Sequence, residues 1–248
     1  MNNTRPLTQV LTAMTLAPGA LTAAQRQRML HILKIYFNGM DADAFRVDLD
    51  EKDAVILLTE EVSGEIRGFS TQKFISTHVD GQPVQAIFSG DTIVEKEYWR
   101  QTILVKAWFK LVLTRLTVCP DVPLYWFLIC MGYKTYRFLP VYFKSYYPSV
   151  ELAGTGEKRI MDVLAQSRFG SQYDATKGII RFTQHGASLK NSFAGIPAGK
   201  EADAHVRLFL EKNPGYLHGD ELACLAKLHP SNFKKAVFRF TQELEFPG

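Results

Sequence analysis

The segment from Gln82 to Leu116 constrains the fold most, because it predicts a β-strand that leads through a short turn into a long amphipathic helix. The first backbone N–H groups of a helix have no partner within the helix, and the helix dipole adds partial positive charge there. A phosphate group at such an end satisfies both. The segment therefore predicts a helix that packs on a sheet and begins with an anion-binding turn. The apolar residues on one face of the predicted helix 96–116 are Leu104, Trp108, Leu111, Val112 and Leu116.

The residues before this segment predict a helix and three antiparallel strands. Thr22 is a suitable N-cap for a helix, and a short second helix is predicted over 42–47. Apolar and alternating patterns predict strands over 54–61 and 64–79, and Asp80 with Gly81 is typical of a tight hairpin before the strand at 82–94. Residues 1–21 carry neither pattern, and we expect them to be a variable leader.

A second buried strand is predicted at 122–130, parallel to the strand at 82–94 because a helix connects the two. Residues 22–150 would then form one core. Residues 151–248 contain a helix, a strand, a helix and an apolar stretch, separated by loops rich in Gly and Ser. We expect this region to be an extension that completes the sheet, with a separate small domain as the alternative.

The stretch from Val94 to Leu104, VEKEYWRQTIL, resembles the acyl-CoA loop of the GNAT superfamily of N-acyltransferases. Arg100 matches the first position of the family's Arg/Gln-x-x-Gly-x-Gly/Ala loop, whereas the expected glycines are missing. The resemblance implies an α/β (α+β) fold with a mixed, mostly antiparallel central sheet flanked by helices. Glycine allows the backbone to approach phosphates closely, so its absence weakens CoA binding or indicates an acyl carrier protein as the donor.

The resemblance also implies that residues 22–150 form the acyl-donor-binding core and that residues 151–248 complete the acceptor site. In GNAT proteins the pantetheine arm pairs with backbone where two parallel strands separate, and the pyrophosphate lies at the start of the following helix. Because Arg100 begins this helix, an exposed side chain with no ligand is the alternative interpretation of that residue. The expected donor-binding positions are Ile93, Val94, Arg100, Gln101, Thr102, Ile103 and Leu104.

Two residues are candidates for the proton transfers of an acyl transfer. Asp91 precedes Val94 on the same predicted strand, where strict alternation would place it among apolar neighbours and raise its pKa into a useful range for a base. A polar bulge without a catalytic role is the alternative, and Glu95 is a second candidate base. Tyr142 lies in VYFKSYYP, which resembles the GNAT element whose tyrosine protonates the departing thiolate. The alternative is an aromatic core residue.

These features predict an N-acyltransferase that moves an acyl group from an acyl-CoA or acyl-carrier-protein thioester to a small-molecule amine. Two alternatives remain open. The chain could have kept the fold as a binding or regulatory module without catalysis, or it could resemble an acyl-homoserine-lactone synthase, which uses acyl carriers. A homodimer is left open.

Composition argues against several other classes of protein. The net charge of +4 comes without a basic run, which argues against a nucleic-acid partner. Three cysteines at scattered positions argue against a disulfide framework and favour the cytoplasm. The six histidines show no metal-ligand spacing, so no metal is expected. The longest apolar run is too short to span a bilayer.

Overall fold

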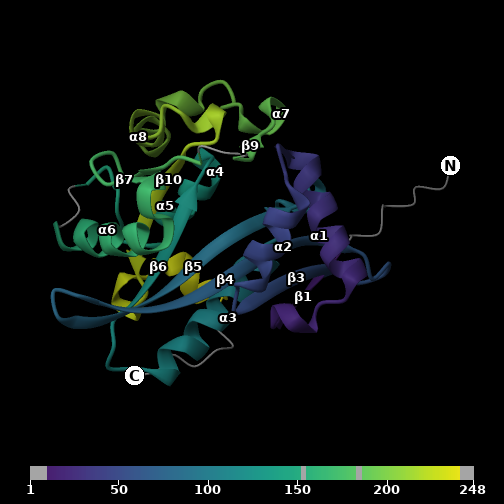
Figure 1. Cartoon of the computed structure of the whole chain (residues 1–248), viewed down its shortest axis with the longest axis horizontal. Coiled ribbons are helices and arrows are strands. Elements are labelled where there is room, and N and C mark those ends of the chain that lie inside the picture. The colour runs from purple at the N-terminus through teal and green to yellow at the C-terminus, as the bar shows by residue number, and fades with distance from the viewer. Residues whose placement is uncertain (1–9, 152–154, 183–185, 241–248) are drawn as a thin grey trace.

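The computed structural model describes residues 10–151, 155–182 and 186–240. A single eight-stranded sheet crosses the molecule in the order β1-β3-β4-β5-β6-β10-β8-β7, and a second sheet pairs β2 with β9 (Figure 1). The strands are β1 Leu11–Leu16, β2 Phe37–Asn38, β3 Ala54–Glu60, β4 Ile66–Val79, β5 Gln82–Val94, β6 Leu124–Cys130, β7 Tyr173–Asp174, β8 Ile179–Ile180, β9 Ser188–Leu189 and β10 Glu221–Lys227. The α-helices are α1 Ala23–Tyr36, α2 Ala42–Asp50, α3 Ile103–Val118, α4 Tyr133–Tyr136, α5 Phe138–Tyr142, α6 Thr155–Phe169, α7 Asn191–Ala194, α8 Ala204–Lys212 and α9 Lys235–Phe240.

The expectation of a variable leader over residues 1–21 is corrected, because Leu11–Leu16 form a strand of the sheet. β1 pairs antiparallel with β3, from Leu11 opposite Glu60 to Leu16 opposite Val55. Leu11 is 3% exposed and packs in the main core. The strand LTAMTL interrupts its apolar residues with threonines, so its pattern did not distinguish an edge strand from a loop. The sheet therefore begins before position 22, and residues 1–9 of the predicted leader lie outside the described part.

The predicted N-terminal elements are otherwise present. Thr22 caps α1 through a reciprocal capping box with Gln25, as its position before an apolar-periodic run indicated. The hairpin between β4 and β5 turns at Asp80 and Gly81, which both have positive φ angles (51° and 80°). β5 and β6 are parallel, as expected from the intervening helix.

The long helix begins at Ile103 rather than at the predicted Lys96. Residues 96–98 form a separate 3₁₀ turn. This turn is held by tertiary contacts, since the Lys96 N–H donates to the Tyr36 hydroxyl (2.7 Å) and the Trp99 indole N–H donates to the Val94 carbonyl (2.7 Å). Contacts outside the segment therefore override the helical propensity of this sequence.

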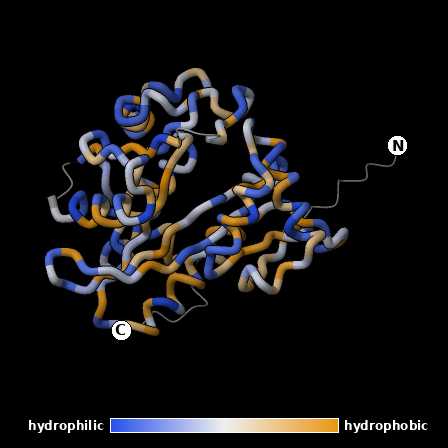
Figure 2. Tube along the Cα trace, in the orientation of Figure 1, coloured by the Kyte–Doolittle hydropathy of each residue, from blue (hydrophilic) through white to orange (hydrophobic). Residues whose placement is uncertain are grey.

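Helices cover both faces of the sheet. Alternate residues of β3 divide between two cores: Val55 and Leu57 pack with α1 and α2, whereas Ile56 and Leu58 pack with α3. Helix α6 packs over Phe88 and Phe127, on the same face as α1 and α2. Figure 2 shows hydrophobic residues along much of the central strands, while hydrophilic and hydrophobic residues alternate along the outer helices. No helix among the described residues is long and apolar enough to cross a membrane.

The C-terminal part continues the same sheet. β10 pairs antiparallel with β6, from Leu222 opposite Cys130 to Lys227 opposite Tyr125, and β8 and β7 extend the sheet further. β9 pairs antiparallel with β2, the short strand that follows α1 and precedes α2 in the chain. Three described strands after α6, namely β7, β8 and β10, thus belong to the same sheet as β1 and β3–β6.

Candidate active site

The site begins where two parallel strands separate. β5 and β6 are paired from Gln85 opposite Leu124 to Ser89 opposite Leu128. Beyond this point β5 pairs only with β4, up to Val94, while β6 continues along β10. Figure 1 shows the two strands diverging toward their C-terminal ends. The sheet therefore contains a V-shaped opening whose narrow end lies at Ser89.

A β-bulge in β5 lies at the narrow end of this opening. Ser89 pairs with Gln72 and Thr92 pairs with Ser70, so Gly90 and Asp91 together face the single residue Thr71. A Cβ atom at Gly90 would lie 2.7 Å from the Thr71 hydroxyl and 2.8 Å from Cε of Lys52. A larger residue at this position would therefore have to displace the Lys52 side chain and the Thr71 hydroxyl.

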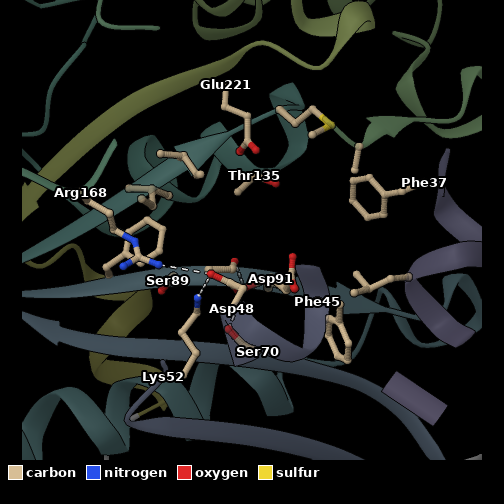
Figure 3. Close-up of a pocket in the computed structure, with 18 of the residues that line it drawn as sticks. Phe37, Phe45, Asp48, Lys52, Ser70, Ser89, Asp91, Thr135, Arg168 and Glu221 are labelled. Atoms are coloured by element: carbon tan, nitrogen blue, oxygen red, sulfur yellow. Dashed lines mark hydrogen bonds and ion pairs between the residues drawn. The ribbon is translucent and has the colours of Figure 1, made fainter. Parts of the chain in front are cut away.

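The bulge corrects the strict alternation expected along β5. Ile87 packs on the α3 side of the sheet, whereas Ile93 packs with α1 and α2. Odd-numbered residues of β5 therefore face opposite sides of the sheet before and after the bulge. Asp91 lies beside Asp48 and Lys52 on the α2 side (Figure 3). The polar bulge considered as the alternative is present, and it directs Asp91 into a cavity.

On the α3 side, the opening is lined by a hydrogen-bonded network. The Ser89 hydroxyl donates to Oε1 of Gln72 (2.7 Å), and Nε2 of Gln72 donates to the Ser70 hydroxyl (2.7 Å). Two indole N–H groups also donate into it, Trp126 to Ser89 (2.9 Å) and Trp108 to Gln72 (3.3 Å). Gln72 is fully buried, and these bonds satisfy its amide.

A cavity of about 430 Å³ passes through the opening. Its walls come from both faces of the sheet, since α2 contributes Phe45 and Asp48 while α3 contributes Leu104 and Trp108. The C-terminal part supplies further wall residues from α6, from the segment before β9 and from β10: Arg168, Phe169, Phe182, Gly186, Ala187 and Glu221. Gly186 and Ala187 thus contribute to the wall of the cavity.

Charged side chains gather on the α2 side of the cavity (Figure 3). Asp48 accepts hydrogen bonds from Nζ of Lys52 (2.5 Å) and from Nη2 of Arg168 (3.3 Å). The Lys52 side chain is fully buried, and the Arg168 guanidinium also lies 4.7 Å from the Phe88 ring centroid. Asp48 is therefore neutralised by two cations, one of which is sequestered from solvent.

Asp91 and Glu221 differ from Asp48, because neither side chain has a hydrogen bond or ion pair with another described residue. Burial raises the pKa of Asp91 to about 6, with a further contribution from Asp48, while Lys52 opposes the shift. Burial raises the pKa of Glu221 to about 8, and the charges of Asp91 and Asp48 add to it. Near neutral pH, Asp91 is mostly ionised and Glu221 mostly protonated.

Tyr142 lines the same cavity from α5. Its ring lies 5.8 Å from that of Phe109 and stacks on Phe138 at 6.0 Å. Burial raises the pKa of its phenol, so the hydroxyl stays protonated at neutral pH. The two residues selected from sequence as proton carriers, Asp91 and Tyr142, therefore lie in the wall of one cavity.

The expected donor-binding residues are dispersed. Leu104 lines the cavity, and Ile103 packs beside it in the main core. The Gln101 N–H donates to the Tyr98 carbonyl (2.9 Å), so this amide already has a partner. Thr102 occupies the N-cap position of α3 without a side-chain cap, and Arg100 is exposed outside the cavity wall.

The two strand positions expected to pair with pantetheine, Ile93 and Val94, lie on β5 beyond the bulge, opposite Phe69 and Gly68 of β4. The wide end of the opening is bridged by aromatic and basic side chains. Nζ of Lys134, on α4 after the end of β6, lies 4.3 Å from the ring centroid of Trp99.

The strand order, the helical crossover and the parallel pair that separates at a bulge match the fold implied by the Val94–Leu104 resemblance. The described fold therefore agrees with the mixed, mostly antiparallel sheet flanked by helices that the resemblance implied. No family model and no curated protein matches the sequence. Solved structures do match, among them a conserved protein of unknown function from Enterococcus faecalis V583 described as a probable N-acyltransferase (TM-score 0.41, 12% identity, 55% of this chain). The match spans only 33% of the Enterococcus protein.

Two further matches are enzymes by name. Glucosamine-6-phosphate N-acetyltransferase from Arabidopsis thaliana aligns over 52% of this chain and 88% of its own length, with a TM-score of 0.38 and 13% identity. An aminoglycoside acetyltransferase from an uncultured soil metagenomic sample aligns over 48% of this chain and 76% of its own length, with a TM-score of 0.33 and 17% identity. These similarities concern the fold.

Sequence reasoning missed several residues of this site. Asp48, Lys52 and Arg168 lie on separate helices and loops, and Glu221 begins β10 shortly after a 3₁₀ turn at Tyr216–His218. None belongs to a motif. The one available signal was an acidic residue at the start of an apolar run, which Glu221 shares with many solvent-exposed strand ends. No group of His, Cys, Asp and Glu suited to a metal occurs among the described residues.

Proposed function

We propose that this protein transfers an acyl group from a CoA or acyl-carrier-protein thioester to the nitrogen of a small-molecule amine. The observation that supports this most is the cavity at the separation of β5 and β6, which has Asp91 on one side of the sheet and Tyr142 in another wall. A thioester that entered between the strands from the α3 side would meet an amine arriving from the α2 side. This arrangement brings both reactants together before reaction.

The proposed reaction forms an N–C bond and breaks a C–S bond. Asp91, ionised above a pH of about 6, takes a proton from the bound ammonium and leaves a nucleophilic amine. The amine attacks the thioester carbonyl, and Tyr142 donates its proton to the departing sulfur. The amide nitrogen releases its second proton to solvent, from which Tyr142 recovers its own.

The nature of the donor is part of the proposal. The turn before α3 contains no glycine and its Gln101 amide is occupied, so less backbone is available to a pyrophosphate than in a glycine-rich loop. A carrier-protein donor presents its phosphopantetheine without the nucleotide, so it needs fewer free backbone N–H groups at this turn. Both donors therefore belong in the test.

Thermal denaturation with CoA, acyl-CoA and acylated carrier protein tests donor binding, because a ligand at 100 times its Kd adds about 2.7 kcal/mol to the free energy of unfolding. Absence of stabilisation by all three would contradict the proposal. Binding without any turnover of amines would instead support the alternative of a regulatory module.

Tyr142→Phe tests the proposed acid. The variant keeps the ring contacts with Phe109 and Phe138, so we expect an unchanged melting temperature and a kcat lowered about 10²-fold. Tyr133→Phe, which changes another buried tyrosine outside the cavity wall, is the matched control. Equal kcat values for both variants would exclude Tyr142 as the proton donor.

A further inference from the structure

Four carboxylates line the cavity: Asp41, Asp48, Asp91 and Glu221. Asp48 has two positive partners, Lys52 and Arg168, and Asp41 accepts a hydrogen bond from the Ala44 N–H. Neither Asp91 nor Glu221 has an ion pair or a hydrogen bond with the described part of the chain. The cavity wall thus contains two carboxyl groups whose oxygens have no bonded partner among the described residues.

The remaining wall gives these carboxylates little compensation. It is largely aromatic and aliphatic, with Phe37, Phe45 and Phe169 around the charged side chains. Removing a carboxylate from water into such surroundings is unfavourable unless the group is paired or takes up a proton. A ligand with positive charges would supply the missing partners.

The two carboxylates come from different parts of the fold. Asp91 is held by the bulge in β5, whereas Glu221 is the first residue of β10, where it pairs with Ile180 of β8. Figure 3 shows Glu221 pointing into the cavity from the side opposite the strand that holds Asp91. Two walls therefore each present one carboxylate to the same space.

We propose, on the basis of the acyl transfer inferred above, that Glu221 determines acceptor specificity by binding a second ammonium group of the acceptor. Asp91 binds the ammonium that is acylated, and Glu221 binds the other. The acceptor is accordingly a diamine or a polyamine. The C-terminal extension, which contributes Glu221, selects the substrate for chemistry performed at the bulge.

Binding of such an acceptor would displace a proton. The charged or titratable groups around Glu221 are Asp91 on β5, Asp48 on α2 and Cys130 on β6, with Lys52 and Arg168 on the far side of Asp48. Glu221 is mostly protonated at pH 7, because its pKa is raised to about 8. A bound ammonium favours the ionised form, so Glu221 releases its proton when a diamine binds. Diamine affinity should then rise with pH from about 6 to 8.

Isothermal titration calorimetry tests this proposal with 1,4-diaminobutane and its matched monoamine, n-butylamine. Titrations at pH 7 in two buffers of different ionisation enthalpy report the protons released. We expect the diamine to bind about 10- to 100-fold more tightly than butylamine and to release up to one proton. In Glu221→Gln, both the preference and the proton release should disappear.

Two further variants complete the experiment. Glu221→Asp keeps the charge on a shorter side chain and should retain part of the preference for the diamine, while Glu61→Gln changes an exposed glutamate outside the cavity wall and should behave as wild type. Circular dichroism verifies folding of each variant. Equal affinity for the two amines, or proton release that persists in Glu221→Gln, would overturn the proposal.

The role proposed for Glu221 and the proposed acyl transfer can be tested separately. Calorimetry measures amine binding with no donor present, so a selective Glu221 site without turnover would contradict the enzyme activity alone. Turnover of butylamine and 1,4-diaminobutane with equal kcat/KM in wild type and Glu221→Gln would contradict the role of Glu221 alone.

Discussion

The two sides of the opening between β5 and β6 differ in whether their polar side chains have hydrogen-bond partners. On the α3 side, Gln72, Ser70 and Ser89 bond to one another and to two tryptophan indoles. On the α2 side, Asp91 and Glu221 lack partners among the described residues and have raised pKa values. The comparison shows that the polar groups on one side are satisfied within the protein, whereas those on the other are left available for the proton transfer and cation binding proposed above.

This contrast follows from the bulge in β5. Because Gly90 and Asp91 together oppose one residue of β4, the strand presents Ser89 and Thr92 to the polar network and Asp91 to the cavity. An uninterrupted strand would not place all three in these directions. The bulge therefore connects a stable scaffold to a reactive carboxylate over a few residues.

The largest effect is expected from Asp91→Asn. Loss of the proposed base should lower kcat by about 10²- to 10⁴-fold and remove the rise in activity as the pH increases through about 6. Steady-state kinetics between pH 5 and 9 measures both effects. Asp121→Asn, at an exposed position, is the control. A retained inflection near pH 6 in Asp91→Asn would assign it to another group.

Gln72→Leu should act on stability instead. Leucine fills a similar volume but leaves the partners of the Gln72 amide unpaired in a buried site, so we expect the free energy of unfolding to fall by about 1–3 kcal/mol. Urea denaturation measures this change, with Gln82→Leu at the exposed start of β5 as control. If Gln72→Leu were as stable as wild type, the hydrogen bonds of Gln72 would not stabilise the α3 side of the opening.

The smallest effect is expected from Glu221→Gln on the pH dependence of stability. The pKa of Glu221 is raised from 4.5 to about 8 in the folded state, so the folded protein binds more protons than the unfolded chain between these values. The free energy of unfolding therefore falls as the pH rises from about 4.5 to about 8. At pH 8.5 we expect Glu221→Gln to melt above wild type, and below about pH 4, where the group is protonated in both states, the two melting curves should coincide. A lower melting temperature at pH 8.5 would indicate an unrecognised partner for Glu221.

Sequence patterns predicted the fold well where local signals agree with the tertiary structure. The cap at Thr22, the hairpin at Asp80 and the parallel crossover are confirmed, since each depends on residues close in the chain. β1 was missed because an edge strand carries a weak pattern, and the start of α3 was placed too early because contacts with Tyr36 hold residues 96–98 in a separate turn.

The candidate site was only partly accessible to the same reasoning. Asp91 and Tyr142 were found from a family resemblance and both line the cavity. Asp48, Lys52 and Glu221 were not found, because their proximity results from the packing of α2 and the pairing of β10 with β6. Such long-range juxtapositions leave no periodic or spacing signal along the chain.

The late position of β10 in the chain has a consequence for biosynthesis. Ribosomes add about 5–20 residues per second, so roughly ten seconds separate the synthesis of Asp91 from that of Glu221. A nascent polypeptide that ends at β6 exposes the edge to which β10 later anneals. During that interval the cavity lacks one of its two proposed amine-binding carboxylates, so the cavity is completed only after residue 221 has been synthesised and β10 has paired with β6.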